Sequence, residues 1–263
     1  MNNGAPLVKI HIHEHTGTLI LNRPDKRNAL TRGLIAELTQ ALDDLRRERR
    51  VRTVVIAGSG SAFCAGMDLN EMQQTAAASN SQELWYDDAT AYRDLLEAIL
   101  QLPKPIIAAV GGPAVAGGAG LALACDIVLA APEAKFGLPE PKRGIVAGLV
   151  APLLVFRLGA GRAAYLLLSA QLIPAEEAFR MGIYHELIPG EKLWPRAHQL
   201  AGEIADCAPE AMLLTKRMLN ETIGENLNTL LTAGAAVSAT ARTTEAAAEG
   251  LAAFIEKREP KFL

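Results

Sequence analysis

A strong excess of charge of either sign is missing from this chain. Its 26 lysine and arginine residues stand against 29 aspartate and glutamate residues, for a net charge of −3. A protein that binds nucleic acid or an anionic membrane surface usually carries a clear excess of basic residues. The composition therefore argues against both kinds of partner.

Cysteine is also scarce, because 263 residues include only Cys64, Cys125 and Cys207. Three cysteines that lie far apart are typical of reduced thiols, not of a disulfide framework. The segment from Met1 to Pro6 has no basic region followed by an apolar run, so we expect no signal peptide. These features predict a cytoplasmic protein, and the length is sufficient to bury one good core.

An uninterrupted apolar helix long enough to span a membrane is absent too. The one long uncharged stretch, Pro105–Cys125, contains five glycines and two prolines, so it could not satisfy its own backbone in lipid. It predicts a buried strand over Ile106–Val110, a turn over Gly111–Ala116 and a helix over Gly117–Ala124. Such a turn presents free N–H groups beside the positive end of the helix dipole, which suits an anionic oxygen. The glycines would equally allow close packing of helix on sheet.

A second strand, turn and helix precede this unit. Thr53–Ala57 predicts a buried strand, and a glycine-containing turn then leads to an apolar-spaced run. Asp68 is expected to cap that helix, and the backbone N–H of Met67 to face outward from the turn. If the two strands are neighbours, the two turns together provide a two-donor oxyanion hole.

Two other kinds of site have partial support in the same region. Gly58 and Gly60 follow the strand as in a dinucleotide motif, but Phe63 stands where the third glycine belongs. Cys64 could act as a nucleophile, although no activating His or Asp can be assigned to it. A buried structural thiol is the favoured interpretation.

The N-terminal region predicts a hairpin, with strands over Leu7–His15 and Thr18–Asn22 around a turn at residues 16 and 17. His11, His13 and His15 alternate along the first strand and would share one face. Zinc binding is possible for such a set, but no further ligand is evident, so no metal is expected.

The remaining segments are mostly helical. Thr31 is a good N-cap for a helix whose leucines recur at helical spacing up to a basic end near Arg50. Four helices are predicted toward the C-terminus, over Leu193–Ala205, Pro209–Ile223, Leu227–Ala239 and Glu245–Ile255. Their apolar positions lie on more than one side, which favours an oligomer.

Six motifs occur in an order that resembles the crotonase, or enoyl-CoA hydratase/isomerase, superfamily. They are Asn22-Arg-Pro with Asn28-Ala-Leu30, Phe63-Cys-Ala-Gly-Met-Asp-Leu69, Pro105-Ile-Ile-Ala-Ala-Val110, Gly117-Gly-Ala-Gly-Leu121, Cys125-Asp-Ile-Val128 and Phe136-Gly-Leu-Pro-Glu140. The similarity extends to Gly182–Glu186 and Phe254–Arg258 and so covers nearly the whole chain. Each motif is modest alone, but the ordered set is specific.

The resemblance implies an α/β fold, a crotonase-like spiral of ββα repeats followed by a C-terminal helical trimerisation region. The spiral core with the acyl-CoA site would span residues 1–190 and the helical region residues 191–263. A homotrimer or a hexamer made of two trimers is implied. The ligand is an acyl-CoA thioester, as in fatty acid metabolism, and no separate cofactor is needed because coenzyme A is part of the substrate.

The resemblance also implies the catalytic residues. The N–H groups of Met67 and Gly117 would bind the thioester oxygen, whose negative charge builds in an enolate-like state. Glu140 matches the family's second catalytic glutamate and would transfer the proton. Its apolar neighbours, among them Leu138 and Ile145, are expected to raise its pKa.

Substrate-binding positions follow from the same comparison. Lys26 and Arg27 in the loop near the entrance could contact the phosphates of coenzyme A, and Lys257 matches a lysine that a neighbouring subunit lends. All three could instead be solvated surface cations. The other expected substrate-binding residues flank the two turns: Ala65, Asp68, Gly118 and Gly120.

One departure from the family pattern leaves the reaction open. Hydratases of this family have a first glutamate where this chain has Gly120, and that residue normally helps to hold and activate water. We therefore expect an enoyl-CoA hydratase that relies on Glu140, with an enoyl-CoA isomerase that needs only one glutamate as an alternative. A non-catalytic acyl-CoA-binding protein is the third possibility, though an oxyanion hole has little use in a binder.

The polar segment Thr75–Asp88 has little pattern and could be a flap over the acyl chain. In that case Leu84, Trp85 and Tyr86 would influence acyl selectivity. These residues could equally form the first turn of a helix that continues through Tyr92.

Overall fold

The computed structural model describes residues 4–224 and 226–262. A six-stranded sheet has the order β1-β2-β3-β4-β6-β9, and a three-stranded sheet has the order β5-β7-β8. The strands are β1 (Val8–His13), β2 (Thr16–Leu21), β3 (Thr53–Gly58), β4 (Ile106–Val110), β5 (Ala114–Val115), β6 (Ile127–Ala130), β7 (Lys135–Gly137), β8 (Leu172–Pro174) and β9 (Glu186–Leu187). In the large sheet β1 and β2 are antiparallel, and the other neighbours are parallel.

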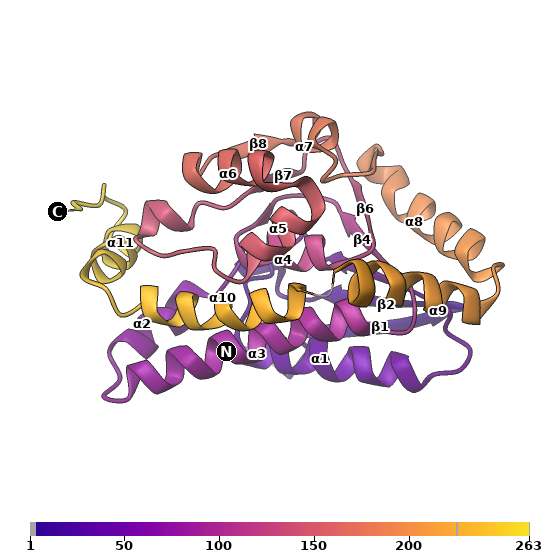
Figure 1. Ribbon diagram of the computed structural model, residues 1–263, viewed down its shortest axis with the longest axis horizontal. Helices are drawn as coiled ribbons and strands as arrows, with labels where there is room; N and C mark the ends of the chain where they lie inside the picture. The colour runs from indigo at the N-terminus through magenta and orange to yellow at the C-terminus, as the bar shows by residue number, and fades with distance from the viewer. Residues whose placement is uncertain (1–3, 225, 263) are drawn as a thin grey trace.

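Helices surround the two sheets (Figure 1). They are α1 (Arg32–Arg47), α2 (Leu69–Ala76), α3 (Ser81–Gln101), α4 (Gly117–Ala124), α5 (Val150–Leu158), α6 (Ala160–Ser169), α7 (Ala175–Met181), α8 (Gly190–Ala205), α9 (Pro209–Arg217), α10 (Leu227–Ala241) and α11 (Glu245–Ile255). Short 3-10 turns form η1 (Pro24–Lys26) and η2 (Glu140–Arg143), and η3 (Met218–Ile223) is a π-helical turn. No helix of the described residues is both long and apolar enough to cross a membrane.

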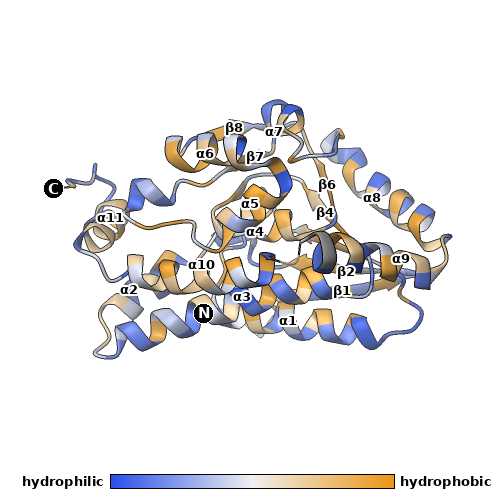
Figure 2. Cartoon of the chain, viewed as in Figure 1, coloured by the Kyte–Doolittle hydropathy of each residue, from blue (hydrophilic) through white to orange (hydrophobic). Residues whose placement is uncertain are grey.

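The large sheet is covered on both faces. One face packs against α8, where Leu193, Ala197 and Ala201 meet side chains of β3, β4 and β6. The opposite face forms the main core with α1, α3 and α4. Because β3 and β4 are buried on both faces, their sequences are almost continuously apolar. Figure 2 shows the same distribution, with hydrophobic residues on the strands and hydrophilic ones along the outer side of α1.

The central unit has the predicted elements. Strand Ile106–Val110 and helix Gly117–Ala124 are confirmed with the same bounds, and the turn between them also contains the two-residue strand β5. Thr31 caps α1 by accepting the Leu34 N–H at 3.1 Å, and α1 ends at Arg47 within the basic segment. These elements depend on apolar spacing and capping between residues close in sequence, so the sequence pattern is enough to predict their bounds.

The predicted turn of the N-terminal hairpin is wrong by two residues. The turn lies at Glu14 and His15, where Glu14 has φ 49°, and β2 begins at Thr16. Gly17 is a strand residue, and a Cβ on it would lie only 2.9 Å from Leu45 methyl carbons, so this glycine allows α1 to approach the sheet. His15 therefore lies outside the strand, although it lines one surface pocket together with His11 and His13. Within the described part of the chain, no group of three or more His, Cys, Asp or Glu residues could hold a metal ion.

The segment Thr75–Asp88 has more regular structure than expected, because α2 continues to Ala76 and α3 begins at Ser81. Trp85, Ala89 and Tyr92 are spaced to bury one face of α3. The alternative, a helix that runs through Tyr92, is therefore confirmed.

The C-terminal part is helical, as expected, but α9 ends at Arg217 and gives way to the π-helical turn instead of continuing as one α-helix to Ile223. In Figure 1, α10 lies along α3, and the two helices are in contact. The last helix, α11, contacts α2 and η2, which brings the end of the chain back toward Glu140.

Candidate active site

Met67 lies in the first of the two turns, and its backbone N–H is directed away from the neighbouring segment at Leu30. Leu30 and Met67 form an isolated parallel bridge, in which Leu30 N–H donates to Gly66 O (2.8 Å) and Asp68 N–H donates to Leu30 O (2.9 Å). In a parallel bridge of this kind, the N–H of the middle residue points away from its partner strand. Met67 lines a cavity of about 890 Å³, which we call the active-site cavity.

Gly117 lies in the second turn and is the first residue of α4, so its N–H has no acceptor within the helix. The preceding residue, Ala116, has φ 53° and ψ −124°, a strained conformation for a residue with a Cβ that costs about 1–3 kcal/mol. Its N–H donates to Gly137 O at 3.0 Å, which anchors the turn to β7. Gly117 lines the active-site cavity together with Met67.

The two turns are in direct contact. Gly66 has φ 91°, and a Cβ on it would lie 2.8 Å from the Cβ of Ala116 and 3.3 Å from the Gly117 nitrogen. Cys64 and Ala114 form a further parallel bridge between the same two segments. Residues 67 and 117 are thus brought to one side of the molecule although fifty positions separate them.

Glu140 is the first residue of η2 and projects into the same cavity. The residue is 6% exposed, and its Oε2 is buried with no hydrogen-bond partner among the described residues. Burial raises the pKa of this carboxyl to about 7, while its own backbone N–H and the charges of Arg143 and Arg242 act in the opposite direction. The predicted rise in the pKa of Glu140 is therefore confirmed, and its cause is the predicted one, burial among apolar neighbours.

Several other residues expected at the substrate lie around the active-site cavity, namely Lys26, Arg27, Ala65 and Asp68. Asp68 has structural partners as well: it accepts the Asn70 N–H at 3.0 Å as cap of α2 and pairs with Arg23 at 3.0 Å. Lys257, in contrast, is exposed after α11 and does not line this cavity.

Gly118 and Gly120 do not line the cavity either. A Cβ on Gly118 would collide with the carbonyl oxygen of Cys64, so this glycine lets α4 pack against the first turn. That is the close-packing role considered above for the glycine run. Cys64 itself is fully buried, and burial raises the pKa of its thiol to about 12, which disfavours a nucleophilic role.

Tyr92 is a cavity residue that the sequence placed only on a predicted helix. Its side chain comes from α3, it is 2% exposed, and its hydroxyl donates a hydrogen bond to Gly117 O. Burial raises the pKa of Tyr92 well above its usual value, so the group stays protonated. The hydroxyl of a buried tyrosine usually has a hydrogen-bond partner. The sequence did not indicate that this partner is Gly117, in the second turn.

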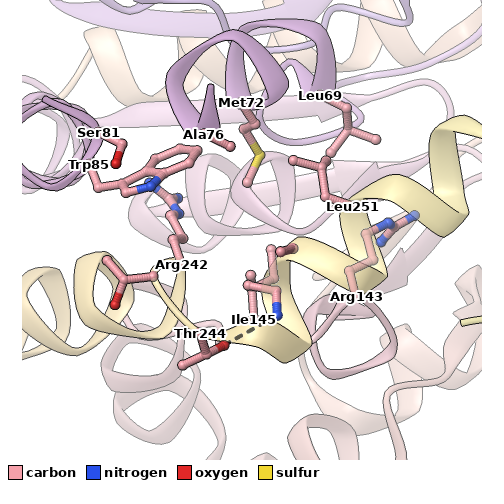
Figure 3. A pocket seen from close by; sticks show the side chains of 13 residues that line it. Leu69, Met72, Ala76, Ser81, Trp85, Arg143, Ile145, Arg242, Thr244 and Leu251 are labelled. Carbon is pink, nitrogen blue, oxygen red and sulfur yellow. Dashed lines mark hydrogen bonds between the residues drawn. The ribbon is translucent and has the colours of Figure 1, made fainter. Parts of the chain in front are cut away.

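A second, smaller cavity of about 190 Å³ adjoins the first, and both are lined by Leu69, Met72, Arg143 and Ile145. Figure 3 shows it between α2, α3 and the C-terminal helices, with Trp85 and Arg242 on one side and Arg143 on the other. The sequence contained no signal for these two arginines as site residues, because η2 and the end of α10 meet only in the folded chain.

Comparison with known proteins identifies the family. A sequence model described as enoyl-CoA hydratase/isomerase matches residues 12–263, and the chain belongs to this family. It is 40% identical over 248 residues to a putative enoyl-CoA hydratase of Thermus thermophilus, covering 94% of this chain and 97% of that protein. It is also 32% identical over 253 residues to a 1,2-epoxyphenylacetyl-CoA isomerase of Escherichia coli, covering 96% of each.

Solved structures agree with the assignment. An enoyl-CoA hydratase/isomerase from Xanthobacter autotrophicus superposes with a TM-score of 0.87 at 28% identity, covering 98% of each chain. The expected crotonase fold is therefore confirmed, as is the expectation of an enzyme of the hydratase and isomerase class.

Proposed function

We propose that this protein adds water to a 2-enoyl-CoA thioester, with Glu140 as acid and base. The observation that carries the proposal is that a buried carboxyl, whose Oε2 has no hydrogen-bond partner among the described residues, lines the same cavity as Met67 and Gly117. The names of relatives support it, among them a crotonyl-CoA hydratase of Syntrophomonas wolfei that is 35% identical over 252 residues and covers 95% of each chain.

The chemistry needs one carboxyl group in two protonation states. Ionised Glu140 takes a proton from water as the water oxygen bonds to the third acyl carbon, and negative charge moves to the thioester oxygen. The N–H groups of Met67 and Gly117 stabilise that charge, and one such donor contributes about 3–4 kcal/mol. Protonated Glu140 then delivers the proton to the second acyl carbon. A pKa of about 7 keeps both forms of Glu140 accessible near neutral pH.

Tyr92 supplies a polar atom beside Gly120, where hydratases of the family have their first glutamate. Its proton is used in the bond to Gly117 O, so its oxygen is free to accept a hydrogen bond from water. In this proposal the hydroxyl helps to hold the attacking water.

The rest of the substrate complex remains prediction. Lys26 and Arg27 would contact the coenzyme A phosphates, and Lys257 would reach a neighbouring subunit's site in a homotrimer or hexamer. Exposed apolar side chains such as Leu168 and Leu214 are consistent with subunit contacts. No cofactor besides the substrate's coenzyme A is proposed, and the expected location is the cytoplasm.

Isomerisation of a 3-enoyl-CoA is the second candidate. It is favoured because Glu140 is the one cavity carboxyl, among the described residues, that is available for proton transfer. The acidic residues that line the active-site cavity are Asp25, Asp68 and Glu140. Asp68 is engaged by Arg23, and Asp25 is exposed in η1 next to the coenzyme-binding cations. One carboxyl suffices to move a proton between two carbons, whereas water activation is usually shared.

The test is to incubate the purified protein with a 2-enoyl-CoA and with a 3-enoyl-CoA and to follow the absorbance of the conjugated thioester. Loss of absorbance from the first substrate supports hydration, and gain from the second supports isomerisation. Glu140→Gln should lower either activity by about two to four orders of magnitude, while the exposed Glu210→Gln serves as control. Near-full activity of Glu140→Gln would remove Glu140 from the mechanism, and no activity across chain lengths would indicate a binding protein.

A further inference from the structure

The smaller cavity, which we call the arginine pocket, has apolar walls and two cationic side chains. Met72, Trp85 and Leu251 contribute apolar surface, and Arg143 and Arg242 contribute guanidinium groups (Figure 3). A cavity lined only for a hydrocarbon chain would not need charged groups, because an unpaired charge in apolar surroundings is costly.

Neither arginine forms an ion pair with an acidic side chain in the part of the chain that the structure describes. No salt bridge or side-chain hydrogen bond within residues 4–224 and 226–262 involves them, and the Nε of Arg143 is buried without an acceptor. Each guanidinium instead lies over an aromatic ring, Arg143 at 4.5 Å from the centre of Phe254 and Arg242 at 5.4 Å from that of Trp85. Stacking holds the groups in place and leaves their N–H donors available.

The nearby acidic groups already have other roles. Asp88 is the acid whose charge acts most on Arg242, but its two oxygens accept from Arg32 at 2.6 and 2.8 Å. The other is Glu140, the proposed acid and base. Burial lowers the pKa of both pocket arginines, yet guanidinium remains protonated in proteins. Among the described residues, the two guanidinium groups of the pocket therefore have no ion-pair partner of their own.

The pocket adjoins the active-site cavity along Leu69, Met72, Arg143 and Ile145, which line both. Lys26 and Arg27 line only the active-site cavity, Arg143 lines both cavities, and Trp85 and Arg242 line only the arginine pocket. A thioester held at the two N–H groups with its coenzyme A toward Lys26 would direct its acyl chain toward Arg143. At about 30 Å³ for each heavy-atom-sized group, a volume of 190 Å³ accommodates a short chain end.

We propose that the acyl group of the substrate ends in a carboxylate, which Arg242 binds with support from the charge of Arg143. The substrate class is then the coenzyme A monothioester of a short unsaturated dicarboxylic acid. A guanidinium fork matches the geometry of a carboxylate, and such charge-assisted hydrogen bonds are about twice as strong as neutral ones. The inference rests on the proposed function, because it takes the thioester to lie at Met67 and Gly117.

The experiment compares two six-carbon 2-enoyl-CoA substrates that differ only in ending in a methyl group or a carboxylate. For the unaltered protein we expect kcat/KM at least about tenfold higher with the carboxylate substrate. Arg242→Met keeps apolar volume beside Trp85 and should lower the ratio of kcat/KM for the carboxylate substrate to that for the methyl substrate by about tenfold to a hundredfold; the ratio cancels the effect of the Arg242 charge on Glu140, which both substrates share. Arg49→Met, an exposed arginine near the end of α1, is the matched control.

Binding separates this inference from the proposed reaction. Calorimetric titration with the saturated six-carbon acyl-CoA pair measures the preference even if neither enoyl substrate reacts. If the carboxylate form binds more tightly and Arg242→Met abolishes this difference, the inference is supported even when neither enoyl substrate reacts. Equal binding and turnover of the two forms, or a preference unchanged in Arg242→Met, would overturn it. If Arg242→Met does not fold, Arg242→Lys is tested by the same preference for the carboxylate form over the methyl form. Lysine keeps the charge but not the planar guanidinium fork, so the preference should fall.

Discussion

The Tyr92 hydroxyl occupies the space in which a side chain at Gly120 would begin. A Cβ on Gly120 would collide with this oxygen and would lie 3.0 Å from a methyl carbon of Val150. The hydroxyl is held in place by its hydrogen bond to Gly117 O. The Tyr92 hydroxyl therefore fills the space that the family's first glutamate would need at position 120, so the buried tyrosine and the glycine depend on each other.

Gly120→Ala should destabilise the protein by about 1–3 kcal/mol through overpacking, although alanine is normally the better helix residue. In a Tyr92→Phe background the penalty should shrink, because the nearest remaining ring carbon would lie 3.4 Å from the new Cβ. Urea unfolding of both single variants and the double variant measures this coupling, which we expect to be about 1 kcal/mol or more. Additive effects would mean that the two positions do not compete for space.

Gly118→Ala should be far more damaging, because its Cβ would meet the Cys64 carbonyl of a rigid backbone segment. We expect a loss of more than about 3 kcal/mol or failure to fold. Gly202→Ala in α8 is the matched control, since a Cβ there meets nothing within 4 Å. It should stabilise the protein by about 0.5–1 kcal/mol. Equal thermal stability of the two variants would contradict the close packing described for α4.

Glu140 should make stability depend on pH. Burial raises its pKa from 4.5 to about 7, so the folded state holds more protons than the unfolded state between these values. Stability is then lost as pH rises through this window, by up to about 3 kcal/mol at 1.36 kcal/mol per pKa unit. Glu140→Gln cannot ionise, so it should exceed the unaltered protein in stability by more at pH 8 than at pH 5. Melting temperatures at both pH values, with Glu210→Gln as control, provide the test.

The same pKa predicts the pH dependence of catalysis. If ionised Glu140 accepts the proton from water, kcat/KM should rise with pH and level off above about 7. A pH profile of the unaltered protein measures this directly. A profile flat between pH 5 and 8 would show that the ionisation of Glu140 does not control the reaction.

Lys216 should be a strong anchor of the C-terminal helices. It is 6% exposed, pairs with Asp126 at 2.8 Å and donates to the carbonyl oxygens of Ile99 and Lys104, both at 3.1 Å. Lys216→Met removes all three contacts and leaves the Asp126 charge without a cationic partner, although Asp126 still accepts the Ile106 N–H at 2.8 Å, and the variant should cost about 3–5 kcal/mol. Chemical denaturation compares this variant with the exposed Lys192→Met, which should change stability by less than about 0.5 kcal/mol. A small effect at Lys216 would show that water replaces its contacts.

Local pattern and ordered motifs were sufficient for much of this protein. The bounds of β4 and α4, the caps at Thr31 and Asp68 and the membership of the enoyl-CoA hydratase/isomerase family could all be predicted, because they depend on short-range spacing and residue type. The turn predicted at Gly17 was wrong because a glycine is typical both of a turn and of a close approach between elements, and only the contact with Leu45 in the folded chain decides between them.

The tertiary structure alone decided what surrounds the reacting atoms. Tyr92 comes from α3 and Arg242 from the end of α10, and each reaches the site of Glu140 from a distant part of the chain. The amino-acid sequence determined which elements form and which chemistry the two turns can support. The Tyr92 hydroxyl and the Arg242 guanidinium join the Glu140 carboxyl through packing between helices far apart in sequence, which short-range spacing does not encode.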